Sequence, residues 1–173
     1  MRLFIAINLH DTTRSHLLAL QDELRARSER GNFSLPENLH LTLAFLGECD
    51  RKQTDTVKSV MDDASFDPFS LTIDRIGRFK RDSGDIWWAS GKAHEILLTL
   101  QRDLTAKLTA LGFALDIRKY SPHITLGREV ATMARPWQVE PFGETVTRID
   151  LMKSERIGGK LTYTSIKNKS GLH

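Results

Sequence analysis

Only one cysteine, Cys49, is present among the 173 residues, so no disulfide bond can form within the chain. A chain of this kind fits a reducing compartment. No apolar run approaches the roughly 18 residues that a membrane-spanning helix needs. The opening stretch MRLFIAINLHD lacks the small-residue cleavage site of a signal peptide and is better predicted as a strand. These absences predict a cytoplasmic protein.

Metal-ligand spacing is also missing from the sequence. There is no His-Glu-x-x-His motif and there are no paired cysteines, and four histidines show no ligand spacing at all: His10, His16, His94 and His173. The formal charge of +3 is compatible with an anionic ligand without requiring one. We therefore expect neither a metal ion nor a cofactor.

Apolar residues follow a strand, helix, strand pattern twice along the chain. The first unit consists of a strand over 2–9, a helix that begins at residues 11–13 and ends at Gly31, and a strand over 40–47. The second unit consists of a strand over 85–90, a helix over 97–111 that ends at Gly112, and a strand over 123–128. Further predicted elements are a helix over 51–64 and strands over 69–79 (with a bend at Gly77), 144–154 and 160–167. The turn sequence RDSGD predicts that the strands 69–79 and 85–90 are antiparallel neighbours.

The two units are related by a constant offset. His40 and Thr42 are each 83 residues before their counterparts His123 and Thr125. The same offset places Ile86, Trp87 and Trp88 on Leu3, Phe4 and Ile5. The sequence is therefore interpreted as a diverged duplication, within one domain over residues 1–173, that forms two lobes around a pseudo-two-fold axis.

A histidine and a threonine two residues apart on a strand point to the same face. Across a pseudo-two-fold axis, His40 would face His123, with Thr42 and Thr125 beside them. Because histidine titrates near neutral pH, one ring can act as a base while the other acts as an acid. Hydroxyl and backbone N–H groups can hold phosphate oxygens as charge develops. This arrangement indicates displacement at phosphorus without a metal ion.

The stretches HLTLAFLG (40–47) and SPHITLGR (121–128) resemble the twin signature of the two-histidine phosphoesterases. More narrowly, they are similar to the RNA 2′,3′-cyclic phosphodiesterases, also called 2′-5′ RNA ligase-like proteins. The resemblance covers nearly the whole chain. It implies an α+β fold of two lobes, in which antiparallel sheets line a central groove and helices lie outside. It also implies hydrolysis of RNA 2′,3′-cyclic phosphate ends to 2′-phosphates.

The same resemblance implies a role for each motif residue. His40 would donate a proton to the leaving 3′ oxygen, and His123 would accept a proton from water. Thr42 and Thr125 would hold the phosphate. Arg128 resembles the basic residue that the family has after the second motif, and a contact with phosphate or substrate is expected of it.

Strand alternation raises a difficulty for two residues. It places Arg128 on the face opposite His123 and Thr125, so that either the strand ends or bulges near Gly127 or Arg128 is structural. Phe45, a candidate for stacking on a base, has the same difficulty and is otherwise a core residue.

The expected partners are RNA ends or nucleotides that carry a 2′,3′-cyclic phosphate, bound by a monomer. Two alternatives remain open from the sequence: joining of RNA ends through a 2′-5′ linkage at the same site, and a binding module for RNA ends or nucleotides without turnover. The densest run of positive charge, formed by Arg75, Arg78, Lys80 and Arg81, is either solvated surface or a region that steers an RNA backbone.

Overall fold

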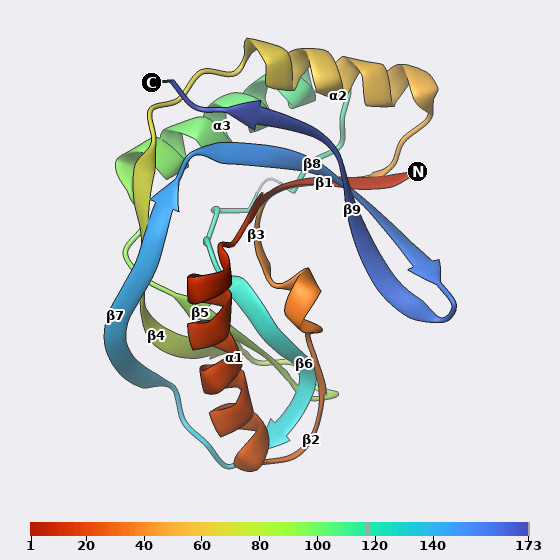
Figure 1. Ribbon diagram of the computed structural model, residues 1–173. Coiled ribbons are helices and arrows are strands. Elements are labelled where there is room, and N and C mark those ends of the chain that lie inside the picture. Colours follow the sequence, from red (N-terminus) through yellow and green to blue (C-terminus); the bar gives the residue numbers. More distant parts are fainter. Residues whose placement is uncertain (117, 173) are drawn as a thin grey trace.

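The computed structural model describes residues 1–116 and 118–172 (Figure 1). The helices of this part of the chain are α1 (Asp11–Ala26), α2 (Arg51–Asp63), α3 (Glu95–Ala110) and the short 3-10 helix η1 (Pro36–Asn38). The strands are β1 (Arg2–Asn8), β2 (Ser28–Phe33), β3 (His40–Glu48), β4 (Phe69–Phe79), β5 (Asp85–Ser90), β6 (Ile124–Thr132), β7 (Trp137–Val146), β8 (Arg148–Ile157) and β9 (Lys160–Ser170). None of the helices just named is long and apolar enough to cross a membrane. The predicted α+β class is confirmed.

The strands join into one antiparallel sheet whose order is itself two-fold symmetric. The order is β7-β4-β5-β6-β3-β1-β8-β9, with β2 paired to β6 from outside this path. The halves meet at β3 and β6, where the recorded register is the single pair Leu41 and Ile124. These two residues are 83 apart, so each one pairs with its own counterpart in the duplication. The pseudo-two-fold axis therefore passes through this pair.

Each repeat sends its helix to the sheet of the other repeat. Helix α1, which follows β1, packs against β6 and β7, whereas α3, which follows β5, packs against β3. Figure 1 shows α1 beside β2 and β6, apart from α2 and α3, which lie together. All three helices cover the face of the sheet that carries the main hydrophobic core, which includes Leu17, Leu41, Trp87, Leu104 and Ile124. None of these three α-helices covers the opposite face of β3 and β6.

Several predicted boundaries are wrong, and the errors have physical causes. Helix α1 ends at Ala26 rather than at Gly31, because residues 28–33 form β2 and pair with β6. The predicted strand 144–154 is two strands, β7 and β8, that divide at Thr147. Strand β4 has no bend at Gly77, since it pairs with β5 in register from Arg75 to Phe79. The predicted antiparallel pairing of β4 and β5 is confirmed.

The offset of the duplication also changes within the sheet. Thr42 pairs with Ala6, and its counterpart Thr125 pairs with Trp88. Ala6 and Trp88 are 82 residues apart, so β5 is shifted by one residue from the predicted alignment. The neighbouring Trp87 is fully buried in the core, and Trp88 lies on the other face.

Candidate active site

The four polar residues of the two motifs lie around the pseudo-two-fold axis. Leu41 and Ile124 are both in the helix-covered core, so the residues on either side of them point to the opposite face. In an antiparallel register through this pair, His40 lies opposite Thr125 and Thr42 lies opposite His123. We call this side of the sheet the two-histidine face.

Both imidazole rings are oriented by the same type of hydrogen bond. The Nδ1 of His40 lies 2.7 Å from the carbonyl oxygen of Asn38, and the Nδ1 of His123 lies 2.7 Å from the carbonyl oxygen of Ser121. A carbonyl oxygen only accepts, so Nδ1 carries a proton in both rings. The neutral ring then has its lone pair on Nε2. Proton exchange in either half therefore takes place at Nε2.

The surroundings of the two rings differ. The Nε2 of His40 is 2.9 Å from the hydroxyl oxygen of Thr42, and its ring contacts Phe4 and Tyr163 at centroid distances of 5.0 and 5.3 Å. These two aromatic residues belong to a small second cluster with Ala6 and Met152. The first histidine is thus enclosed by the curled β1-β8-β9 part of the sheet.

The ring of His123 lies against a different aromatic pair. Phe79 meets it edge-on at 5.1 Å, and Trp88 lies at 6.5 Å. Phe79 and Trp88 come from β4 and β5, the strands that are symmetric to β8 and β1. Both rings are therefore lined by aromatic side chains.

The electrostatic environment lowers the pKa of both imidazoles. Burial lowers the pKa of His40, the hydrogen bond to Asn38 opposes this, and the nearby cations His123 and Arg128 lower it further. Burial also lowers the pKa of His123, with the hydrogen bond to Ser121 opposing and Arg128 adding to the decrease. The charge of Arg128 thus reaches both rings. Both histidines favour the neutral form more than a free imidazole does.

A pair of β-bulges brings Phe45 and Arg128 to the two-histidine face. On β3, Thr42 pairs with Ala6 and Ala44 with Ile5, so two steps on β3 match one step on β1. The same shift occurs on β6, where two steps from Thr125 match one step on β5. A bulge of this kind inserts one residue and reverses the alternation beyond it.

The bulges resolve the difficulty that strict alternation created. Beyond them, Phe45 pairs with Phe4, and Arg128 follows two consecutive buried residues. The two residues are 83 apart and are thus equivalent positions of the duplication. The Phe45 side chain is 50% exposed rather than a core residue, and the guanidinium of Arg2 lies 5.0 Å from its ring centre. A phenyl ring and a guanidinium therefore occupy equivalent places on the same face.

Asn38 is a residue of this site that the motif reading missed. It is buried, its carbonyl oxygen accepts from His40, and its side-chain amide donates to the carbonyl oxygen of Leu161 at 2.9 Å. An ion pair of 2.6 Å between Lys160 and Glu37 connects the same two segments. The β8–β9 hairpin thereby holds η1, and η1 holds His40. The offset of 83 between Asn38 and Ser121 was the available signal.

A side chain from the loop before the second motif also links the halves. The hydroxyl of Tyr120 donates to the carbonyl oxygen of Thr42 at 2.8 Å, and burial raises the pKa of this phenol. On the other side, the hydroxyl of Ser34 donates to the carbonyl oxygen of Thr125 at 3.0 Å. Each motif strand is thus tied to a segment of the other half at the level of its threonine.

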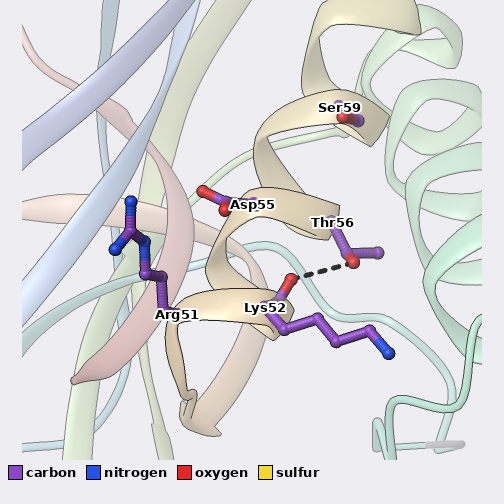
Figure 2. A pocket seen from close by; sticks show the side chains of 5 residues that line it. All are labelled: Arg51, Lys52, Asp55, Thr56 and Ser59. Atoms are coloured by element: carbon purple, nitrogen blue, oxygen red, sulfur yellow. Dashed lines mark hydrogen bonds between the residues drawn. The ribbon is translucent and has the colours of Figure 1, made fainter.

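A surface hollow is also present on α2. This hollow of about 470 Å³ is lined by five residues of α2, namely Arg51, Lys52, Asp55, Thr56 and Ser59 (Figure 2). Figure 2 shows that the hydroxyl of Thr56 donates a hydrogen bond to the backbone carbonyl of Lys52. The proton of this hydroxyl is therefore already used within the helix. No group of three potential metal ligands occurs among residues 1–116 and 118–172, and His173 lies outside these residues. Within this range, the two motifs form the site with the clearest chemistry.

Comparison with known proteins identifies similar phosphoesterases. The family model described as LigT-like phosphoesterase matches residues 7–88. An RNA 2′,3′-cyclic phosphodiesterase of Archaeoglobus fulgidus is 32% identical over 155 residues, which cover 86% of this chain and 87% of that protein. One from Methanothermobacter thermautotrophicus is 28% identical over 96% of this chain and 97% of that protein. The structure of Escherichia coli LigT complexed with 3′-AMP superposes with a TM-score of 0.86 at 26% identity, covering 99% of this chain and 98% of that one.

Proposed function

This chain belongs to the LigT-like phosphoesterase family of RNA 2′,3′-cyclic phosphodiesterases, and from that premise we propose that it opens the cyclic phosphate with His40 and His123 as acid and base. The substrate is an RNA end or a nucleotide with a 2′,3′-cyclic phosphate, and the product is the 2′-phosphate. The observation that carries the proposal is the pairing of Leu41 with its own counterpart Ile124. That pairing supports a site in which each half contributes one histidine to one phosphorus atom.

In the proposed reaction, the Nε2 of His123 removes a proton from a water molecule. The water oxygen attacks phosphorus in line with the bond to the 3′ oxygen. The Nε2 of protonated His40 donates its proton to that oxygen as the bond breaks. The Nδ1 protons stay on their rings, hydrogen-bonded to the carbonyl oxygens of Asn38 and Ser121, so each ring changes charge at Nε2 alone. Each histidine ends with the proton state opposite to the one in which it began.

The remaining polar groups of the face bind the phosphate. The hydroxyls of Thr42 and Thr125 donate to the non-bridging oxygens, whose negative charge grows in the transition state. Arg128 adds a charge-assisted hydrogen bond to the same oxygens. Phe45, at the position equivalent to Arg128, offers its exposed ring to the base of the terminal nucleotide. The division between a cationic and an aromatic position orients the nucleotide across the axis.

The proposal also covers the domain organisation, location, oligomeric state and metal requirement of the protein. It treats residues 1–173 as one domain, because neither half holds both histidines. It takes the protein as a cytoplasmic monomer, which agrees with a free, buried Cys49. It also requires no metal ion, because the acid and base are side chains of the chain itself.

Product analysis with adenosine 2′,3′-cyclic phosphate in the presence of EDTA tests the proposal. We expect conversion to the 2′-monophosphate alone, since the 3′ oxygen is the leaving group. A His16→Ala variant serves as the control, because His16 is an exposed histidine on α1 outside the site. The 3′-monophosphate as product, or a folded protein without turnover of either this nucleotide or an RNA with a cyclic end, would contradict the proposal.

A further inference from the structure

One strand beside His123 carries an alternating series of basic, small and aromatic residues. On β4, Arg75, Gly77 and Phe79 are two residues apart and share the two-histidine face. Gly77 pairs with Trp88, and Phe79 contacts the ring of His123 at 5.1 Å. Beyond the end of β4, the guanidinium of Arg81 lies 5.9 Å from the centre of the Phe79 ring. We call Arg75, Gly77, Phe79 and Arg81 the β4 strip.

Gly77 makes room for an aromatic surface within this strip. A side chain at this position would collide with the indole ring of Trp88. The ring of Trp88 therefore lies over Gly77, with its centroid 5.5 Å from that of the Phe79 ring. Two aromatic rings next to the catalytic histidine are thus flanked by an arginine at either end.

The symmetric strand β8 shows that this series is specific to one half. Gly77 pairs with Trp88, which in turn pairs with Thr125. In the other half, Asp150 pairs with Ala6, which in turn pairs with Thr42. Gly77 and Asp150 are therefore equivalent positions. Two residues earlier on each strand stands an arginine, Arg75 on β4 and Arg148 on β8. Both halves therefore place an arginine at the same register position of equivalent strands.

The two arginines differ in what they bind. Arg148 contacts both carboxylate oxygens of Asp150 at 3.1 and 3.2 Å. Asp150 is completely buried and also accepts from Ser165 at 2.6 Å. Removal of Arg148 from this carboxylate would leave a buried charge unpaired. The guanidinium of Arg148 therefore has a structural role.

Arg75 has no such partner, because the equivalent of Asp150 is Gly77. Its one ion pair within the described residues is a 3.4 Å contact with the adjacent Asp74, and both side chains are more than 40% exposed. Exposed pairs of this type contribute little to stability. The guanidinium of Arg75 is therefore available to a ligand. Arg81 is exposed as well, and its guanidinium bonds to the backbone oxygen of Lys80.

We propose that the β4 strip binds the single-stranded RNA that precedes the cyclic end, with Arg75 and Arg81 on its phosphates and the rings of Phe79 and Trp88 against its bases. Proteins bind single strands with this combination of cations along the backbone and aromatic platforms for the bases. The strip is continuous with His123. The inference deepens the proposed function, on which it rests, by naming an RNA strand rather than a free nucleotide as the substrate that the molecule favours.

Two substrates and one binding probe test the strip. The substrates are an RNA octamer with a 2′,3′-cyclic end and adenosine 2′,3′-cyclic phosphate. The binding probe is a 5′-fluorescein RNA octamer with a 3′-phosphate, followed by fluorescence anisotropy at several salt concentrations. The test protein is Arg75→Ala/Arg81→Ala. The control is Arg102→Ala/Lys107→Ala, which removes the same charge from the exposed side of α3.

We expect the wild type to favour the octamer over the mononucleotide in kcat/KM. In the strip variant this preference falls about tenfold or more, because charge-assisted contacts to phosphate are among the strong hydrogen bonds. The plot of log affinity against log salt becomes shallower by about 1.4, the value for two phosphates of a single strand. The control variant retains both properties. Asp74→Asn, which removes the competing carboxylate, tightens binding of the probe.

The outcomes separate the strip from the reaction. The proposal for the β4 strip is wrong if the wild type shows no preference for the octamer. It is also wrong if the strip variant and the control variant have the same preference and salt dependence. If the wild type turns over neither substrate but the salt dependence still changes in the strip variant, the strip is supported and the proposed function is lost.

Discussion

In the first half of the molecule, both ring nitrogens of the motif histidine have hydrogen-bond partners, whereas in the second half one ring nitrogen has a partner within the described residues. His40 bonds to Asn38 through Nδ1 and to Thr42 through Nε2. Within the described residues, the hydrogen bond recorded for the ring of His123 is that of Nδ1 to Ser121. The shared Nδ1 bond is what the duplication retained, because it determines the tautomer in both halves. The two halves differ in the contacts of Nε2. In the proposed reaction, Nε2 is the atom at which the acid and the base have different roles.

The two bulges show the same division between a common frame and different contents. Each bulge turns one residue onto the two-histidine face at the same place, but the residue is Phe45 in one half and Arg128 in the other. A symmetric frame alone would bind its substrate equally well in two orientations. In the proposed function, we expect the exchange of a ring for a cation to make one orientation preferable, so that asymmetric chemistry can take place at a symmetric site.

Replacement of either histidine should have the largest effect on turnover. We expect His40→Ala and His123→Ala each to lower kcat for adenosine 2′,3′-cyclic phosphate by about 10²–10⁴-fold, the usual contribution of a general acid or base. The double variant should lose less than the product of the two factors, because the groups act as a unit. Steady-state kinetics on variants with wild-type circular dichroism measures this. Wild-type turnover in either folded variant would end the acid-base account.

The equivalent residues Arg128 and Phe45 should differ in the kind of effect they produce. Arg128→Met should lower kcat/KM about 10–100-fold, since a hydrogen bond to a charged group contributes about 1.5–3 kcal/mol. It should also move the pH optimum upward, because the charge of Arg128 lowers the pKa of both His40 and His123. Phe45→Leu should weaken nucleotide binding without moving the optimum. Equal shifts in the two pH profiles would contradict the assignment of Arg128 as the shared cation.

Asn38 and Ser121 allow a comparison of the two supports. Asn38→Ala removes the amide that donates to the carbonyl of Leu161 and leaves that buried acceptor without a partner, at a cost of about 1–3 kcal/mol. Ser121→Ala should change little, because only the backbone oxygen of Ser121 holds His123. Urea unfolding gives the stabilities, and kcat should fall only in the Asn38 variant. Equal stability of the two variants would show that the hairpin does not support the first histidine.

The pH dependence of stability should show the smallest effect. Both histidines have lowered pKa values in the folded state, so the unfolded state binds more protons once the pH falls through the usual histidine pKa of about 6.5. Stability is then complete above that pH and decreases below it, until the folded-state pKa values are passed. Urea unfolding at pH 5 and pH 8 should show a smaller difference in His40→Ala/His123→Ala than in the wild type. An unchanged difference would place the pH dependence in other groups.

The duplication, the motif strands and the face that carries His40 and His123 could be predicted from the sequence, because alternation and the offset of 83 residues are local and repetitive signals. The positions of Phe45 and Arg128 could not be predicted in the same way. A bulge depends on how two strands match across the sheet, and alternation along one strand contains no information about that match.

The missed strands have a similar explanation. The sequence of β2, SERGNF, is polar and mostly exposed, so no apolar period distinguishes it from the end of a helix. It forms a strand because it can pair with β6, which is far away in sequence. The contact between Asn38 and Leu161 is equally long-range and depends on the curl of the β8–β9 hairpin.

The pH profiles of kcat/KM for His40→Ala and His123→Ala on adenosine 2′,3′-cyclic phosphate test the central claim most directly. With His123 as the remaining base, the rate of His40→Ala should rise with pH through the histidine range and then level off. With His40 as the remaining acid, the rate of His123→Ala should fall as the pH rises through the same range. The assignment of one acid and one base to the two halves would be contradicted if kcat/KM changed with pH in the same direction in both variants. A bell-shaped pH profile in either variant would also contradict it.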